Sequence, residues 1–309
     1  MMAKIFIDGS AGTTGLKIVS RLSNDKSLEL IILDGDDRKD PEARKKALNS
    51  CDIAFLCLPD QAARESVSLI ENPDVRVIDT STAHRTEPGW TYGFPELKWQ
   101  RDKIVASKRV ANPGCHASGF ISLVRPLTGC GLLKPETFLT ATSITGYSGG
   151  GKKMIADYEN PELKESLSTP RLYGLTQEHK HLKEMVKITG LAVNPAFMPI
   201  VSPFYSGMTV MVPVFGKDVG VTIDEVRDVF SEYYRDCELV KFIGDKSEDG
   251  FLATGGISGS DRMEIYVYGN NDRMVLVSRF DNLGKGASGA AIQNMNIMLG
   301  RAETEGLVI

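Results

Sequence analysis

The sequence predicts an α/β protein in which a doubly wound parallel sheet is followed by an α+β domain with a mixed sheet. Short apolar strands alternate with helical segments along the first third of the chain. From about Cys115 onward, runs of strands predominate. The length of 309 residues also favours two domains, because single hydrophobic cores stop growing at about 250–300 residues.

The first part has the pattern of right-handed βαβ units. The segment Leu28–Leu33 is almost continuously apolar, which is typical of a parallel strand buried on both faces. Leu16, Val19 and Leu22 have helical spacing. We expect strands at Lys4–Asp8, Leu28–Leu33, Ile53–Leu58 and Val75–Asp79, and helices at Leu16–Leu22, Glu42–Asn49 and Ala62–Ile70.

The second part is richer in Thr, Ile, Val and Met. The segment Gly269–Asp272 carries turn residues between two apolar runs, which predicts a hairpin. A final helix has Ile292, Met295 and Met298 on one face. We expect strands at Thr137–Ile144, Met208–Phe215, Met263–Tyr268 and Met274–Phe280, and the final helix at Ala287–Leu299.

The composition is that of a globular protein, with 42% hydrophobic and 25% charged residues. The formal net charge of −4 gives no long-range attraction for nucleic acid or anionic membranes, so neither is an expected partner. The first residues run directly into a strand without a signal-peptide pattern, and no apolar run has membrane-spanning length. We therefore expect a cytoplasmic protein.

The glycines of one loop predict a dinucleotide site of the Rossmann type. Gly9, Gly12 and Gly15 lie between the first strand and the first helix, where backbone N–H groups can hold a pyrophosphate. The spacing is G-x-x-G-x-x-G, so the position between strand and helix carries the argument. The alternative is a tight turn and nothing more. The candidate cofactor residues here are Gly9, Ser10, Ala11, Gly12, Thr13, Thr14 and Gly15.

Two features of the next loop favour different cofactors. Asp34 ends the second strand, where a carboxylate would bind the ribose 2′-hydroxyl of NAD. Arg38 and Lys39 follow, and they could neutralise the 2′-phosphate of NADP. Most loop cations are simply solvated, which is the alternative interpretation. We expect NADP(H), with Arg38 as the cation.

The chain has five cysteines, an odd number without a C-x-x-C pair, so we expect neither a disulfide framework nor a metal site. Cys115 follows the turn at Pro113–Gly114 and falls in the first turn of a helix expected over Ala117–Leu127. Unpaired N–H groups and the helix dipole favour a thiolate there, which lowers a cysteine pKa below the free value of about 8.5. Cys115 is therefore a candidate nucleophile; the alternative is a small buried hydrophobe.

A thiol mechanism needs a group that transfers protons near neutral pH, and the chain has four histidines. The side chain of His116 points about 100° away from that of Cys115 on a helix, so we disfavour it. His84 follows a sheet strand and could face a cofactor or substrate. His179 and His181 open the amphipathic segment Leu182–Ile188, and residues at i and i+2 of a helix face different ways. At most one of the pair is then the base, and a surface role for either is the alternative.

A second glycine-rich loop follows the strand that ends at Ile144. Ser148, Gly149 and Gly150 precede Lys152, and their N–H groups, hydroxyl and ammonium could hold a phosphate or carboxylate. The alternative is a flexible connector.

Together these motifs resemble the short form of the N-acetyl-γ-glutamyl-phosphate reductase family of arginine biosynthesis. The resemblance covers essentially the whole chain. The motifs that carry it, in order, are Gly9–Gly15, Asp79–Arg85, Tyr92–Leu97, Asn112–Cys115, Glu178–His181, Pro203–Gly207 and Asp281–Gly289.

The resemblance implies a reaction. The Cys115 thiolate attacks the acyl phosphate, phosphate leaves, and NADPH reduces the thioester to N-acetylglutamate 5-semialdehyde. It points to His179 for proton transfer, with His181 as the fallback, and to Glu184 as an organising residue. The family commonly has proline where this chain has Lys183, which we interpret as a change at the helix start.

The resemblance also assigns binding residues and domain boundaries. Ser81, Asn282, Lys285 and Gly286 are the further cofactor candidates, and Arg85 with Ser148, Gly149 and Gly150 are the substrate candidates. The expected domains are a dinucleotide-binding domain over residues 1–114, completed by a C-terminal helix over 285–309, and a catalytic and oligomerisation domain over 115–284.

Three other functions stay open at this point. Aspartate-semialdehyde dehydrogenase shares the plan and the chemistry, and a LysW-linked aminoadipyl-phosphate reductase is a further enzyme alternative. A non-catalytic NADP-binding sensor would keep the Gly9–Gly15 loop and need no nucleophile. A homo-oligomer, dimer or tetramer, is expected because the sheet of the second domain needs a covering partner. The remaining expected partners are the acyl-phosphate substrate and phosphate.

Overall fold

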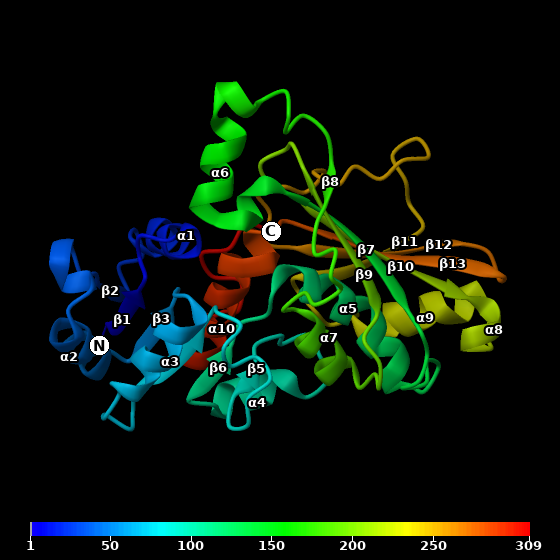
Figure 1. The fold of residues 1–309 in the computed structure, drawn as a ribbon. Coiled ribbons are helices and arrows are strands. Elements are labelled where there is room, and N and C mark those ends of the chain that lie inside the picture. The colour runs from blue at the N-terminus through cyan, green and yellow to red at the C-terminus, as the bar shows by residue number, and fades with distance from the viewer. Residues whose placement is uncertain (1) are drawn as a thin grey trace. The chain divides into compact units, whose positions relative to one another are not determined.

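The computed structural model describes residues 2–309 and divides into two compact units (Figure 1). One unit runs to Pro113 and includes Ala287–Leu307, and the other comprises Gly114–Gly286 with Val308–Ile309. Within the described residues, no helix has both the length and the hydrophobicity needed to cross a membrane.

The first unit contains a six-stranded parallel sheet in the order β2-β1-β3-β4-β6-β5. Its strands are β1 Ala3–Asp8, β2 Leu28–Ile31, β3 Ile53–Leu56, β4 Arg76–Asp79, β5 Thr91–Tyr92 and β6 Arg109–Ala111. Its helices are α1 Thr13–Leu22, the 3₁₀ helix η1 Gly35–Arg38, α2 Pro41–Ser50, α3 Asp60–Ser68, α4 Gln100–Ala106 and α10 Gly289–Leu299.

Helices cover both faces of this sheet. On one face, Ile18 of α1, Ile104 of α4 and Ile292 of α10 pack in one apolar cluster with β1 and β3. On the other face, Leu48 of α2 and Ala63 of α3 pack against the opposite sides of the same strands. This is the doubly wound arrangement that the alternating pattern predicts, and the predicted fold class is confirmed.

Two expectations for this unit are wrong in detail. The strand expected over Leu28–Leu33 ends at Ile31 and has only Leu28 buried, because β2 is an edge strand that pairs with β1 alone. The final helix is buried on all sides rather than along one face, and the buried residues include Gln293, Asn294 and Asn296. The side-chain amides of these residues form hydrogen bonds within the first unit. For example, Asn294 donates to the carbonyl oxygen of Gly93 at 2.9 Å.

The second unit contains a mixed seven-stranded sheet in the order β11-β12-β13-β10-β7-β9-β8. Its strands are β7 Thr140–Gly146, β8 Arg171–Leu172, β9 Ala196–Ser202, β10 Met208–Phe215, β11 Val240–Gly244, β12 Met263–Gly269 and β13 Arg273–Phe280. Its helices are α5 Cys115–Gly129, η2 Tyr147–Gly150, α6 Gly151–Glu159, η3 Pro161–Leu163, α7 Leu182–Thr189, α8 Gly216–Val219 and α9 Ile223–Tyr233. A π-helical turn, η4 Gly284–Ser288, follows β13.

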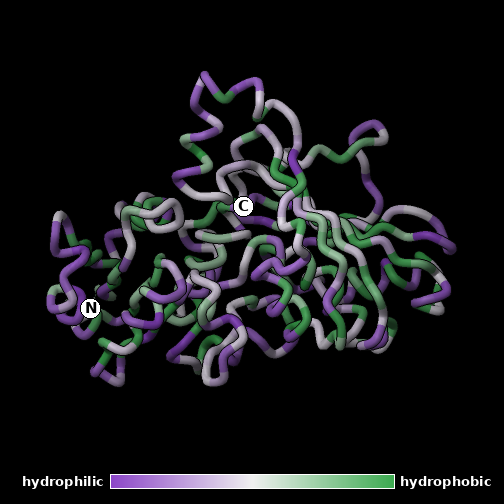
Figure 2. Tube along the Cα trace, in the orientation of Figure 1, coloured by the Kyte–Doolittle hydropathy of each residue, from purple (hydrophilic) through white to green (hydrophobic). Residues whose placement is uncertain are grey.

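Helices α5 and α9 pack on the same face of this sheet, and α7 packs on α5 (Figure 1). Figure 2 shows hydrophobic segments along the strands, in keeping with buried Val210, Val212 and Leu276. The predicted hairpin is present, since β12 and β13 pair antiparallel around the expected turn. The amino-terminal end of α5 and the carboxyl-terminal end of β13 therefore belong to one packed unit.

Candidate active site

Cys115 is the first residue of α5, and the residue before it is the N-cap Gly114, which has no side chain to cap the helix. The thiol residue is partly exposed. Cys115 thus lies at the amino-terminal end of α5, where unpaired N–H groups and the positive end of the helix dipole favour an anion. The helix begins two residues earlier than expected, and the Cys115 position at its start agrees with the prediction.

Glu184 connects this helix start to the histidine pair. Its side chain is 1% exposed, and Oε2 accepts a hydrogen bond from the N–H of Gly114 at 3.1 Å. Its Oε1 lies 4.0 Å from Nε2 of His181. One carboxylate therefore binds the backbone next to Cys115 and lies near a candidate base.

The two histidines lie against one another rather than facing different ways. They precede α7, with His181 as its N-cap, so the helical geometry that we expected is wrong here. Their rings are 4.7 Å apart and nearly perpendicular. Nδ1 of His179 accepts the backbone N–H of His181 at 3.2 Å. His181 is buried, whereas His179 is half-buried.

His116, which the sequence disfavoured, belongs to the same cluster. Its ring centroid lies 5.5 Å from that of His179 and 5.6 Å from that of His181. Its Nδ1 is hydrogen-bonded to the Ser143 hydroxyl at 2.7 Å and its Nε2 to the Tyr173 hydroxyl at 2.6 Å. Burial, with a smaller contribution from His179, lowers the pKa of His116 to about 3, so the ring is neutral at physiological pH. It is a structural hydrogen-bonding group and not a base.

Tyr173 lies near Cys115 in the candidate site, although no sequence motif identifies it. Burial raises the pKa of the Tyr173 hydroxyl, and the nearby Cys115 raises it further, which puts the two side chains in one neighbourhood. Tyr173 is 58 positions from Cys115 in the chain and lies outside the family motifs. The only signal was its place shortly before the H-x-H pair.

The turn after β13 packs against Cys115. A Cβ atom built on Gly286 would lie 3.0 Å from Cβ of Cys115, so glycine permits this close packing. Asn282 is buried, and its amide donates to the Ser148 hydroxyl at 2.9 Å. Gly149 lies next to the same amide, and a Cβ there would be 3.4 Å from its nitrogen. The structure thus brings together Cys115 with Gly286, and Ser148 with Asn282; Lys285 is buried in the same turn.

In the first unit, the backbone of the loop Gly9–Gly15 packs so closely on adjacent backbone atoms that a side chain at Gly9 or Gly15 would clash. Gly9 has a φ of +85°, and a Cβ on Gly15 would lie 2.3 Å from the carbonyl oxygen of Gly9. Gly12 is the N-cap of α1 and carries no side-chain cap, which leaves first-turn N–H groups for an anion. Ser10, Ala11, Thr13 and Thr14 complete the turn.

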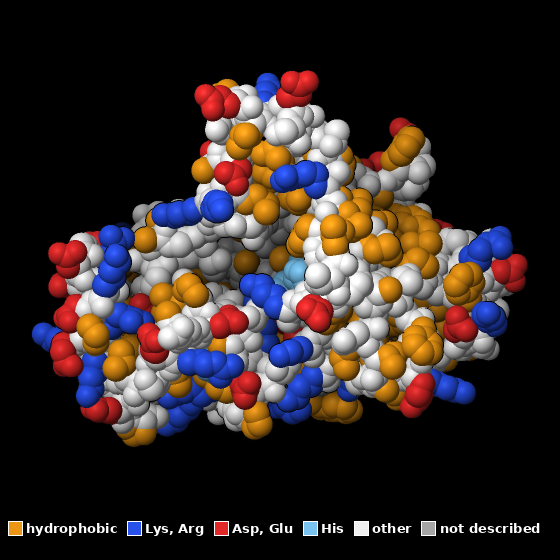
Figure 3. All heavy atoms as spheres, in the orientation of Figure 1, with side chains coloured by type: hydrophobic (Ala, Val, Ile, Leu, Met, Phe, Trp, Pro, Cys, Tyr) orange, Lys and Arg blue, Asp and Glu red, His pale blue; other side chains and the backbone are white. Residues whose placement is uncertain are grey.

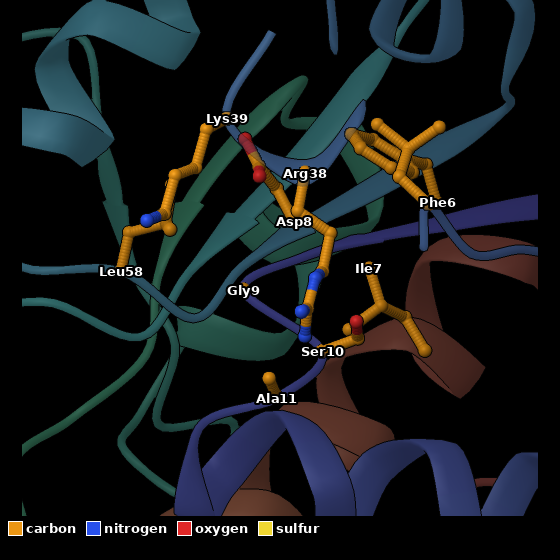
Figure 4. A pocket seen from close by; sticks show the side chains of 10 residues that line it. Phe6, Ile7, Asp8, Gly9, Ser10, Ala11, Arg38, Lys39 and Leu58 are labelled. Carbon is orange, nitrogen blue, oxygen red and sulfur yellow. The ribbon is translucent and has the colours of Figure 1, made fainter. Parts of the chain in front are cut away.

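A cavity of about 280 Å³ opens beside this loop (Figure 4). Gly9, Ser10 and Ala11 form one wall, and Arg38 and Lys39 contribute the cations. Figure 4 shows the Arg38 side chain extending toward the loop. Asp34 precedes η1 and is not among the lining residues. The residues present fit the phosphate-bearing end of a dinucleotide, and the cations suit a 2′-phosphate.

Hydrogen bonds link the side chains of the segment that follows β4 to Asp79, the last residue of that strand, and to nearby backbone carbonyls. The Ser81 hydroxyl donates to Asp79 at 2.7 Å, and Nδ1 of His84 lies 2.6 Å from the same carboxylate. His84 also stacks on Trp90, with ring centroids 4.0 Å apart. Arg85 is 9% exposed and donates to the carbonyl oxygens of Asn112 at 2.9 Å and Thr80 at 3.0 Å. These contacts fix the loop at the ends of β4 and β6.

The surface charges are mixed. On the face shown in Figure 3, basic and acidic side chains are interspersed, in agreement with the net charge of −4. No group of three or more acidic, cysteine or histidine side chains with metal-binding geometry is found among residues 2–309.

Family models match both units. Residues 4–106 match "Semialdehyde dehydrogenase, NAD binding domain", and residues 115–282 match "Semialdehyde dehydrogenase, dimerisation domain". Among solved structures, the chain resembles aspartate semialdehyde dehydrogenase from Francisella tularensis, with a TM-score of 0.73 at 17% identity over 96% of this chain and 100% of that chain. It also resembles aspartate semialdehyde dehydrogenase II from Vibrio cholerae, with a TM-score of 0.72 at 15% identity over 97% and 99%. At these identities the likeness shows the fold alone.

Curated relatives are closer in sequence. N-acetyl-gamma-glutamyl-phosphate reductase 2 of a Nostoc species is 44% identical over 98% of this chain and 99% of its own length. N-acetyl-gamma-glutamyl-phosphate reductase of Allorhizobium ampelinum is 44% identical over 97% and 99%. The resemblance inferred from the motifs is confirmed. The chain belongs to the N-acetyl-gamma-glutamyl-phosphate reductase family.

Proposed function

We propose that this chain reduces N-acetyl-γ-glutamyl phosphate to N-acetylglutamate 5-semialdehyde and phosphate with NADPH, as a step of arginine biosynthesis. The observation that carries the proposal is Cys115 at the start of α5, with Glu184 bonded to the preceding N–H group. The 44% identity to reductases of that name supports the choice of substrate. The second unit would carry the catalytic residues and the first would bind the cofactor.

The Cys115 thiolate would attack the acyl carbon, and the C–O bond to phosphate would break as the C–S bond forms. The resulting thioester splits a difficult reduction into two easier steps. When bound, NADPH supplies the hydride that reduces this thioester. The thiohemiacetal oxygen would then give up its proton while the C–S bond breaks, which releases the aldehyde and restores the thiolate.

The His179–His181 pair would accept and return the proton. The resemblance favours His179, whereas the geometry supports His181, because Glu184 lies beside its Nε2 and also binds the Gly114 N–H. A carboxylate next to an imidazole stabilises the imidazolium that forms in proton transfer. We therefore propose His181 as the acid and base, with His179 as the neighbour that the matched variants must test.

Cofactor binding would use the loop Gly9–Gly15 and the start of α1, with Arg38 at the 2′-phosphate. The cavity that Arg38 and Lys39 share with Gly9 supports this assignment. Asn282, Lys285 and Gly286 would approach the nicotinamide end, and Ser81 would support the loop after β4. For the acyl phosphate we propose Arg85 and the turn Ser148–Gly150, whose cation and N–H groups suit an anion.

A homo-oligomer would cover the free face of the seven-stranded sheet. Helices pack on the face that carries Val210 and Val212, while Ile144, Ile200 and Met211 on the opposite face are only partly buried. The family model that matches residues 115–282 is described as a dimerisation domain, which supports this interface. All five cysteines are thiols rather than disulfides, which suits a reducing compartment, and we propose the cytoplasm.

The test compares the wild-type protein with Cys115→Ser, His179→Asn and His181→Asn. We expect NADP reduction with N-acetylglutamate semialdehyde and phosphate, and none with aspartate semialdehyde. Cys115→Ser should lose turnover by at least about 10³-fold and keep NADPH binding. His181→Asn should reduce kcat by about 10²–10⁴-fold and His179→Asn by much less. Turnover only with aspartate semialdehyde, or full activity of Cys115→Ser, would refute the proposal.

A further inference from the structure

Asp281 is a buried carboxylate that the reaction does not use directly. It follows β13, is 3% exposed and has five donor groups within hydrogen-bond distance. All five donors are neutral groups, so each bond helps to offset the cost of burying the charge. Such a concentration of donors on one side chain fixes the surrounding backbone.

The two oxygens of this carboxylate have different partners. Oδ1 accepts the N–H groups of Leu283 at 2.6 Å and Gly284 at 3.1 Å, which closes the turn that contains Asp281. Oδ2 accepts the N–H of Gly259 at 2.6 Å and lies 3.0 Å from the hydroxyl of Ser206 and 3.3 Å from that of Ser258. Oδ2 therefore joins the turn to two other loops.

Those two loops also pack on each other. The hydroxyls of Ser206 and Ser258 also lie within hydrogen-bond distance of each other. Because each hydroxyl has one proton, only two of the three contacts among these hydroxyls and Oδ2 are hydrogen bonds at any one time. A Cβ on Gly207 would lie 2.9 Å from Cα of Gly255, so the backbones are in direct contact. The Gly207 N–H donates to Oδ1 of Asn282 at 2.9 Å, which adds a second link to the same turn.

The turn held by Asp281 reaches the nucleophile. The backbone carbonyl of Asp281 accepts the N–H of Gly286 at 2.9 Å, and Gly286 packs against Cys115. Asn282 reaches Ser148 from the same turn. A shift of this turn by a few tenths of an ångström would therefore move both Gly286 relative to Cys115 and Asn282 relative to Ser148.

We propose that Asp281 is a positioning residue: through Oδ2 it locks the turn 281–286 to the loops at Ser206 and Gly259, and so holds Gly286 against Cys115 and Asn282 against Ser148. The inference rests on the proposed function for its kinetic readout. Misplacement of groups around a reacting centre lowers the rate more than the binding of substrate.

The decisive variant is Asp281→Asn. With its amide oxygen at the Oδ1 position it keeps the bonds to Leu283 and Gly284, while an NH₂ group at the Oδ2 position cannot accept the Gly259 N–H. We expect kcat to fall by about 10–100-fold and KM to change by less than about threefold. The rate of Cys115 alkylation by iodoacetamide, which needs no substrate, should rise by about threefold or more as the turn loosens.

Glu225→Ala is the matched control. Glu225 forms a capping box with Thr222 at the start of α9, so this variant removes a carboxylate that also accepts a backbone N–H. We expect a lower Tm without a change in kcat or in the alkylation rate. Equal losses of kcat in Glu225→Ala and Asp281→Asn would make the role of Asp281 merely structural and overturn the proposal.

A second variant guards against misfolding of Asp281→Asn. The double change Ser206→Ala and Ser258→Ala removes two of the three donors to Oδ2 and should move kcat and alkylation in the same directions by smaller factors. Wild-type alkylation and kcat in both variants would refute the inference. If the wild-type protein fails to turn over the acyl phosphate, the proposed function fails, and the alkylation rates still decide the role of Asp281.

Discussion

The contact between Gly15 and Gly9 makes the glycine loop open to a quantitative test. A Cβ on Gly15 would lie 2.3 Å from the carbonyl oxygen of Gly9 and 2.9 Å from Cα of Ser10. Favourable contacts begin at about 3.5 Å, so Gly15→Ala forces α1 and the loop apart by about 1 Å. Overpacking of this kind costs about 1–3 kcal/mol, and the better helix propensity of alanine returns up to about 1 kcal/mol.

The expected net destabilisation by Gly15→Ala is about 1–2 kcal/mol, which lowers Tm by about 2–8 °C in a protein of this size. The displaced N–H groups should also weaken NADPH binding by about tenfold or more. Thermal unfolding followed by circular dichroism and NADPH titration followed by fluorescence measure the two effects.

Gly12→Ala is the matched change in the same loop. A Cβ there would lie 3.4 Å from the nearest atom, the Gly9 carbonyl oxygen, which is an ordinary contact. We expect Gly12→Ala to lower the free energy of unfolding by roughly 0.5–1 kcal/mol, and Tm by about 1–4 °C, because glycine is a better N-cap than alanine and no steric clash adds to this cost. NADPH binding should still weaken if the pyrophosphate approaches this backbone. A Gly15→Ala variant as stable as Gly12→Ala, with wild-type NADPH affinity, would refute the close-packing argument.

Two further outcomes follow from side chains in each unit. Arg38→Ala should weaken NADPH binding by about tenfold or more and leave NADH binding nearly unchanged, and equal effects in parallel titrations would remove the 2′-phosphate role. For His116 the pKa is lowered from 6.5 to about 3 in the folded protein, so the unfolded chain binds the additional proton between these values. Stability should therefore fall as pH drops below about 6.5, by up to about 1.4 kcal/mol per pH unit from this group. His116→Gln should flatten that slope in urea unfolding measured at several pH values, and an unchanged slope would contradict the assignment.

The glycine loop, the alternating strands and the position of Cys115 could be predicted because each depends on neighbouring residues. A helix start, an apolar period and a turn are local properties, and they carry most of the fold class. The short edge strand β2 could not be predicted, because its burial depends on its having a single partner in the sheet.

The sequence by itself determined that a cysteine, the candidate nucleophile, stands at a helix start, that a glycine loop joins the first strand to the first helix, and which family the chain belongs to. The tertiary structure decided which polar groups meet near Cys115. Glu184 reaches Gly114 across 70 positions, and Asp281 reaches Ser206 across 75. His116 lies next to Cys115 in the chain, yet only the packing of β7 and the residues before α7 shows that it is a neutral bridge between Ser143 and Tyr173. Helix geometry acts over a few residues, whereas hydrogen bonds and burial are set by chain segments that meet only in the folded protein.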